Sequence, residues 1–327
     1  MIIKIFDNGW GSEYPAKQLE NRLLQHWMDQ LDSDNRSTVV INSVWYSSDY
    51  HEQQVIPFLE SNNVDRIVLV AMLDFAIPQP DWFTEYAPVT AVGYYNSKQF
   101  VDYWAVFLHE TFQDPNLSPL LRVDCIKHAY MCLNRKPHWH RRRLYKQLAS
   151  RQLLDSGLVS LGGDNTPAVR TISESVSPDN LAPNSDSQQN GIPNDISSLG
   201  TIENWQSCFL NVVTETVYGV DQHYFVSEKI YKPILGVRPF LVYDTDGGTE
   251  WLSDRGFEVY TKDFNDITDL DLANGENIAE FLETLCAQPK SYWQHKFLSL
   301  QEKLLYNRNH FGRYASQQLE KLSHSIV

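Results

Sequence analysis

Cysteine is scarce in this chain, and its few cysteines are far apart. Cys125, Cys132, Cys208 and Cys286 form no CxxC pair and do not have the spacing of a zinc knuckle. A dense disulfide framework is therefore excluded. We expect a protein of a reducing compartment.

Long apolar segments are also lacking. No run of 18 apolar residues occurs, and the opening residues, MIIKIFDNGW, are apolar for only about five positions. The sequence therefore predicts a soluble, cytoplasmic protein without a transmembrane segment.

Basic residues are outnumbered by acidic ones. The chain has 27 Lys and Arg against 41 Asp and Glu, a net charge of −14. A field of this sign repels phosphate backbones and anionic lipids, so nucleic acid is not an expected partner. Neither a GxGxxG loop nor a Walker-type loop is present, which argues against dehydrogenases and P-loop enzymes.

What the sequence does contain is a repeated alternation of strand and helix patterns. The 327 residues suit two domains of about 150 residues each. Uninterrupted apolar runs are typical of parallel strands covered on both faces. We expect an α/β protein of two Rossmann-like, doubly wound domains, 1–122 and 123–327. The expected strands are 2–6, 38–45, 66–73, 89–95, 126–133, 158–161, 239–243 and 257–260.

Helical patterns fill most of the intervals between these strands. They cover 15–31, 51–59, 97–111, 137–154 and 248–255, and further helices run from residue 278 to the end. Residues 163–203 are rich in Ser, Asn, Asp, Pro and Gly, and we interpret them as a long polar loop within the second domain, with or without a role.

A basic segment stands out against the acidic background. Residues 127–151 contain eight Lys or Arg and no Asp or Glu. One interpretation is an anion site at a strand-to-helix turn, where backbone N–H groups add to the side chains. The other is a solvated helix face. His138 and His140 have no acidic or Cys partner nearby, so we expect surface histidines and no metal site.

The Ser227-Glu228-Lys229 turn has a more specific pattern. Ser227 is suited to cap a helix whose first turn holds Glu228 and Lys229. A glutamate there can accept hydrogen bonds from ribose or sugar hydroxyls, and a lysine can neutralise a diphosphate. The alternative is that an acidic residue in a first turn simply favours the helix dipole.

The segments FLNVVTETV and YFVSEKIYKPILGVRPFLV together resemble the signature of the α1,3-fucosyltransferases. That signature has an upstream glutamate, then Y-V-T-E-K, a short helix and a P-V-V strand. Tyr224, Ser227, Glu228, Lys229 and Pro239 match this pattern, with Ser in place of Thr, and Glu215 stands for the upstream glutamate. MCLNRKPHWHRRRLYKQL resembles the family's strand, turn and R-x-x-Y helix, with Arg142 at the arginine. The resemblance covers about 130 residues of the second half, and the first half shows only a compatible fold pattern.

This resemblance implies a GT-B glycosyltransferase whose second domain binds the donor. The implied reaction is an inverting, metal-independent transfer from a GDP- or UDP-linked sugar to a glycan or other hydroxyl acceptor, without a cofactor. Lys229 and Arg142 would hold the diphosphate, while Glu228 and Glu215 would contact the nucleoside or sugar.

An inverting transfer needs a carboxylate base for the acceptor hydroxyl. Asp74, after the most apolar strand of the first domain, is the first choice, and Asp7 the second. Two alternatives stay open: another sugar-nucleotide enzyme on the same scaffold, such as an epimerase or a phosphorylase, and a non-catalytic carbohydrate-binding protein.

Overall fold

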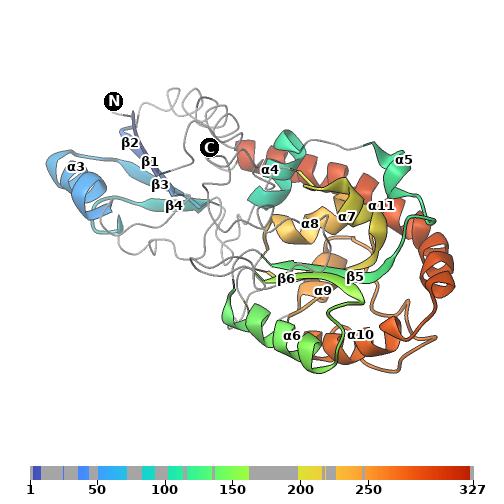
Figure 1. The fold of residues 1–327 in the computed structure, drawn as a ribbon. Helices are drawn as coiled ribbons and strands as arrows, with labels where there is room; N and C mark the ends of the chain where they lie inside the picture. The colour runs from blue at the N-terminus through green and yellow to red at the C-terminus, as the bar shows by residue number, and fades with distance from the viewer. Residues whose placement is uncertain are drawn as a thin grey trace. The chain divides into compact units, whose positions relative to one another are not determined.

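The computed structural model describes residues 3–8, 25, 36–43, 51–71, 83–92, 102–112, 116–134, 137–161, 198–215, 218, 226–244 and 247–324. The chain divides into two compact units, each with a parallel sheet (Figure 1). Unit 1 comprises Met1–Phe112 and Gly312–Val327, and unit 2 comprises Gln113–Phe311. The expectation of an α/β protein with parallel sheets is confirmed.

The sheet of unit 1 follows the order of the chain. Its strands pair in the order β1-β2-β3-β4, all parallel. The middle strands have no alternation, and the side chains of 39–41 and 67–69 are all buried, because the sheet is covered on both faces. The elements are β1 (Ile3–Asn8), β2 (Thr38–Ser43), η1 (His51–Val55), α3 (Ile56–Ser61), β3 (Arg66–Ala71), β4 (Val89–Val92) and α4 (Tyr103–Thr111).

The end of the long helix α11 (Lys290–His324) belongs to unit 1 because it bonds to the start of α4. Asp102 caps α4 by accepting from the Ala105 N–H at 3.0 Å. Its other carboxylate oxygen accepts from the Tyr314 hydroxyl at 3.0 Å, and its own N–H donates to Gln318 at 3.1 Å. Through these buried bonds the last residues of the chain belong to the same unit as the first residues.

The sheet of unit 2 contains a reversal of strand order. The order is β6-β5-β7-β8, all parallel, so the chain first moves to one side of β5 and then crosses to the other. Figure 1 shows α6 and α10 on one face and α7 and α8 on the other. The elements are α5 (Leu117–Leu120), β5 (His128–Asn134), α6 (Trp139–Ser150), β6 (Gly157–Leu161), α7 (Ile202–Ser207), β7 (Cys208–Val213), α8 (Glu228–Leu235), β8 (Phe240–Val242), α9 (Gly248–Asp254), η6 (Gly275–Asn277) and α10 (Ile278–Cys286).

Residues 113–122 belong to unit 2, and Arg238 binds this segment to the rest of the unit. Its fully buried guanidinium donates to the carbonyl oxygens of Leu120 at 2.6 Å, Trp205 at 2.6 Å and Cys208 at 2.9 Å. Burial lowers the pKa of Arg238 to about 10. Because a buried cation needs these acceptors, the segment before β5 is fixed to the sheet that follows it.

Seven of the eight expected strands are present, with shifted ends. The strand expected at 257–260 is wrong: these residues form no strand. The Glu258 N–H donates to the Asn307 amide oxygen at 2.8 Å, and the Glu258 carbonyl accepts from the Asn307 amide nitrogen at 2.8 Å. A buried side chain of α11 therefore supplies the hydrogen bonds that a neighbouring strand would have made.

Two other expectations fall largely outside the described residues. Of the helix expected at 15–31, Gln25 alone is described, and it is helical. Of the polar loop expected at 163–203, only 198–203 are described, and α7 begins within them. None of the helices that the structure describes has both the length and the apolar character to cross a membrane.

Candidate functional site

The carboxyl ends of β5 and β7 are the candidate site, because strand order reverses between them. Ligands in open α/β sheets bind beyond the carboxyl ends of the strands at such a reversal. Here a buried polar cluster joins three strands: the Thr214 hydroxyl donates to the Asn134 side chain, and the Asn134 N–H donates to the Ser160 hydroxyl at 3.2 Å. The edge is thus polar although the strands are apolar.

Glu215 follows β7 and is buried, with 2% of its surface exposed. One carboxylate oxygen accepts from the Ser227 N–H at 3.1 Å, and the other pairs with the Ser227 hydroxyl. Both oxygens are thus bound to the residue that precedes α8. This geometry links the end of β7 to the beginning of the next helix.

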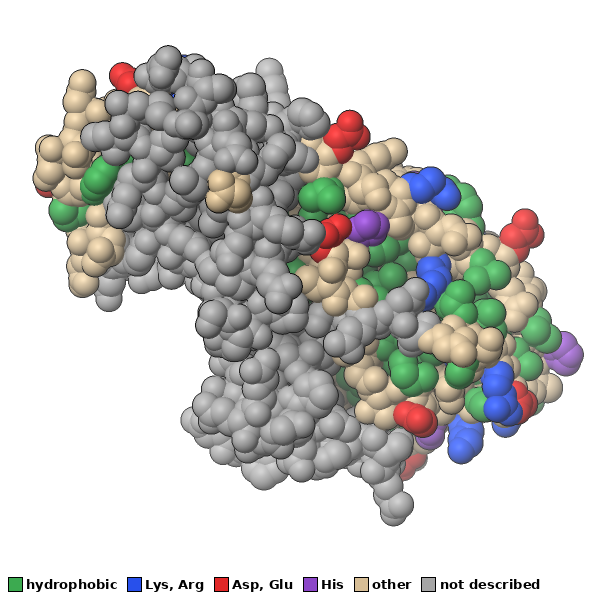
Figure 2. Space-filling model, turned by 90° about the horizontal axis from the view of Figure 1, so that it is seen from above, with side chains coloured by type: hydrophobic (Ala, Val, Ile, Leu, Met, Phe, Trp, Pro, Cys, Tyr) green, Lys and Arg blue, Asp and Glu red, His purple; other side chains and the backbone are tan. Residues whose placement is uncertain are grey.

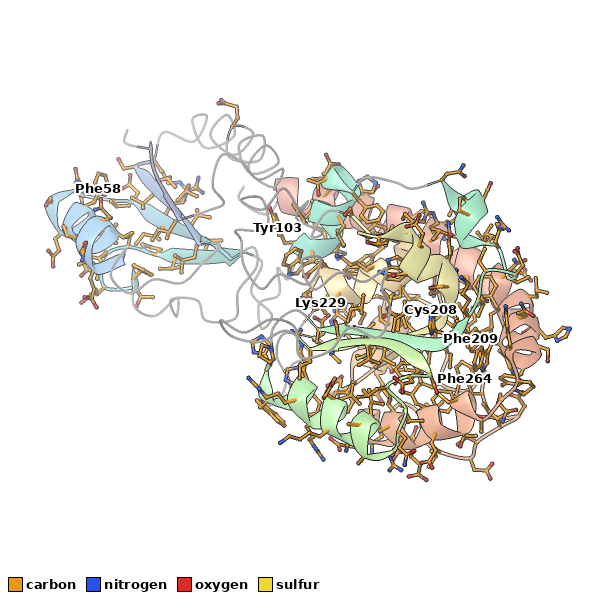
Figure 3. All side chains as sticks on the ribbon, viewed as in Figure 1. Phe58, Tyr103, Cys208, Phe209, Lys229 and Phe264 are labelled. Atoms are coloured by element: carbon orange, nitrogen blue, oxygen red, sulfur yellow. The ribbon has the colours of Figure 1, made fainter. Side chains whose placement is uncertain are left out.

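Ser227 caps α8, as the sequence predicted. Its hydroxyl accepts from the Lys229 N–H at 3.4 Å and from Lys229 Nζ at 3.1 Å. Lys229 Nζ also contacts a Glu228 carboxylate oxygen at 2.8 Å. The lysine side chain is 31% exposed and that of Glu228 is 11% exposed. Figure 3 labels Lys229 on α8 and Cys208 and Phe209 at the beginning of β7.

The first turn of α6 closes the other side of this cluster. His140 Nε2 donates to the Glu215 carbonyl oxygen at 2.9 Å, and the Arg141 guanidinium donates to the carbonyls of Thr214 and Glu215, both at 2.9 Å. Both side chains are buried. The expectation of a surface histidine is therefore wrong for His140, because its ring satisfies a carbonyl that β7 leaves unpaired.

Aromatic rings lie beside His140. Tyr218 stacks on His140 with ring centroids 5.2 Å apart and contacts Tyr243 at 5.3 Å. Trp139 packs nearly perpendicular to His140 and Tyr218, and 59% of its surface stays exposed. Because more than half of this residue is open to solvent, the first residue of α6 offers an aromatic surface for a ligand ring.

The carboxyl end of β8 is fixed by backbone contacts. The Asp244 carboxylate accepts from the Gly248 N–H at 2.7 Å, at the start of α9, and the Asp244 carbonyl accepts from the Gly275 N–H at 2.9 Å. A Cβ on Gly275 would lie 2.2 Å from the Asp244 nitrogen, so only glycine fits there. The carboxylate and the carbonyl of Asp244, the residue that follows β8, are therefore both hydrogen-bonded to backbone N–H groups of unit 2.

Burial shifts two pKa values in the cluster in opposite directions. It raises the pKa of Glu215 to about 7, against the opposing effects of the Lys229 charge and the Ser227 hydrogen bonds. It lowers the pKa of His140 to about 4. At neutral pH His140 is therefore uncharged, and Glu215 binds a proton more readily than an exposed glutamate does.

The structure brings four of the predicted donor residues, Glu215, Ser227, Glu228 and Lys229, into one hydrogen-bonded cluster. Arg142 does not join it within the described residues: it is exposed, and its Nε donates to the Pro137 carbonyl at 2.8 Å.

The remaining predicted residues lie elsewhere. Tyr224 and Asp74 are outside the described residues. Asp7 is the last but one residue of β1, opposite Asn42 of β2. Both candidates for the base belong to unit 1.

The sequence analysis did not single out Asn134, Thr214 and Arg141, and it placed His140 at the surface. Asn134 and Thr214 carry a usable signal, since each is a polar residue at the end of an uninterrupted apolar strand. His140 and Arg141 lie in the basic segment, and nothing in its sequence separates these two buried residues from the exposed Arg142 and Arg143 beside them. On the face of the molecule that Figure 2 draws, Lys and Arg side chains are interspersed with acidic and apolar ones.

No family model, curated protein or solved structure matches the chain. Within the described residues, no group of three or more His, Cys, Asp or Glu side chains is arranged to hold a metal ion.

Proposed function

We propose that the chain is a glycosyltransferase that moves a sugar from a nucleotide-sugar donor to a hydroxyl acceptor. The observation that carries the proposal is the cluster of Glu215 with Ser227, Glu228 and Lys229 beside the reversal of strand order. The same residues carry the resemblance to the α1,3-fucosyltransferases. A sequence pattern and a spatial arrangement thus point to the same edge of unit 2.

Two residues of the cluster and two residues of α6 have proposed tasks in donor binding. Lys229, with a partly exposed side chain, would neutralise the diphosphate, and Glu228 would accept hydrogen bonds from ribose or sugar hydroxyls. Arg142, exposed on α6, is a second cation for the anionic donor. Trp139 offers an exposed ring on which the nucleobase of the donor can stack. Tyr224 remains a further proposed donor contact.

The GT-B arrangement is part of the proposal, with unit 1 as the acceptor domain. Its support is that two α/β units, each with a parallel sheet, share the chain. A carboxylate of unit 1, Asp74 or Asp7, would take the proton of the acceptor hydroxyl as its oxygen attacks the anomeric carbon. The bond from that carbon to the diphosphate breaks, and Lys229 stabilises the leaving charge. Inversion and independence of metal come from the resemblance.

A donor-turnover assay tests this function. The protein is incubated with GDP- and UDP-linked sugars, with and without glycan acceptors, and released nucleoside diphosphate and glycosylated product are measured in the presence of EDTA. The proposal predicts diphosphate release that depends on an acceptor and matches product formation. An altered donor without transfer would favour an epimerase, and glycan binding without turnover of any donor would favour a carbohydrate-binding protein.

A further inference from the structure

Glu215 has almost no exposed surface with which to contact a ligand, although the sequence analysis placed it among the donor contacts. It is 2% exposed, and both carboxylate oxygens are bound to Ser227. Its backbone carbonyl is also engaged, by His140 and Arg141. A side chain in this environment acts on a ligand only through its neighbours.

Ser227 connects Glu215 to Lys229. A hydroxyl has one donor and two acceptor positions. When the Ser227 hydroxyl donates to the Glu215 carboxylate, its acceptor positions take the Lys229 N–H at 3.4 Å and Lys229 Nζ at 3.1 Å. Every hydrogen-bonding position of this hydroxyl is then used. The carboxylate thus fixes the direction in which Ser227 can accept.

We propose that Glu215 is a positioning residue of the donor site, which holds Ser227 and through it orients the Lys229 ammonium. This inference rests on the proposed function in naming Lys229 as the diphosphate ligand. The charged and titratable groups that face Glu215 come from two elements: Glu228 and Lys229 from α8, and His140 and Arg141 from α6. Burial raises the pKa of Glu215 to about 7, so its ionisation lies within an accessible range of pH.

The first experiment needs no nucleotide. Lys229 is acetylated with an amine-directed reagent at pH 8, and its rate is compared by mass spectrometry with that of Lys232 on the same helix. We expect Glu215→Gln and Ser227→Ala to raise the acetylation rate of Lys229 about tenfold, because the loss of one charge-assisted hydrogen bond changes an equilibrium by about a factor of ten. Ser227→Thr keeps the hydroxyl and should restore the slow rate.

Lys232 distinguishes positioning from a structural role. If Glu215 merely stabilised α8, its replacement would raise the rates of Lys229 and Lys232 together. Positioning predicts a change at Lys229 alone. It also predicts a wild-type ratio of the two rates that changes near pH 7 and a Glu215→Gln ratio that does not. Equal rates of Lys229 in all four proteins would overturn the inference.

The second experiment measures the affinity for GDP and UDP by calorimetry. Glu215→Gln should weaken binding about tenfold, and the double variant with Lys229→Ala should bind no more weakly than Lys229→Ala alone. Additive losses would contradict a role through Lys229. If neither nucleotide binds the wild type, the proposed function fails, and the acetylation rates alone decide whether Glu215 orients Lys229.

Discussion

Glu215 and His140 are two buried titratable residues that share one hydrogen bond and respond to pH in opposite ways. Burial moves the pKa of Glu215 from 4.5 to about 7 and that of His140 from 6.5 to about 4. The folded chain thus favours the protonated carboxyl and the neutral imidazole. Their contributions to the pH dependence of stability have opposite signs and largely cancel in the wild type.

Single substitutions should separate the two contributions. Glu215 binds its proton more tightly in the folded chain, so its contribution is present at low pH and is lost as pH rises through about 7. We therefore compare the unfolding free energies of the wild type and Glu215→Gln. The wild-type value minus the variant value should fall by roughly 3 kcal/mol as pH rises from 4.5 to about 7.

The difference between wild type and His140→Gln should instead rise by roughly 3 kcal/mol as pH rises from about 4 to 6.5, because the unfolded chain binds the proton more tightly. Urea unfolding at several pH values measures both differences. Differences that do not change with pH would show that the two residues are not buried as described.

Adjacent arginines of α6 form a second test at this scale. Arg141 is buried and donates to two carbonyls beyond β7, whereas Arg142 is exposed. Arg141→Ala should lower the unfolding free energy by about 2 kcal/mol, and Arg142→Ala by less than about 0.5 kcal/mol. Thermal or urea unfolding checks the pair. Equal losses for both variants would contradict the assignment.

At the scale of elements, what the sequence predicts depends on whether the determining contacts are local. Seven of the strands that the structure describes were predictable, because parallel strands covered on both faces require uninterrupted apolar runs. β7 was not among the expected strands. The cap of α8 was predictable because Ser227 and Lys229 are two residues apart. The absence of a strand at 257–260 depends on Asn307, which is 49 residues from Glu258. The burial of His140 depends on Glu215, which is 75 residues away. No local sequence pattern reveals contacts over such separations.

Two glycines in different elements should respond oppositely to alanine. A Cβ on Gly312 in α11 would meet nothing within 4 Å, so Gly312→Ala should stabilise the chain by about 0.5–1 kcal/mol through helix propensity. A Cβ on Gly157, the first residue of β6, would lie 2.6 Å from the buried Tyr130 ring. Gly157→Ala should therefore destabilise by about 1–3 kcal/mol. Shifts of the same sign in urea unfolding would contradict this packing.

At the scale of the whole molecule, the chain passes between its two units twice, after Phe112 and again within α11. Sequence reasoning predicted two α/β units but placed their boundary at residue 122. The boundary depends on Arg238, which binds the Leu120 carbonyl from far along the chain, and on Asp102, which binds Tyr314. Such contacts between distant segments cannot be inferred from composition or periodicity.

We propose that the carboxyl edge of unit 2 binds a nucleoside diphosphate through Lys229. Titration calorimetry with GDP and UDP should give saturable binding for at least one of them. Lys229→Ala should weaken that binding at least about tenfold, because a charge-assisted hydrogen bond to phosphate is worth about 1.5–3 kcal/mol. Lys232→Ala, three residues along the same helix, should change it less than about twofold. Binding of neither nucleotide, or equal affinities for wild type and Lys229→Ala, would contradict this role of Lys229.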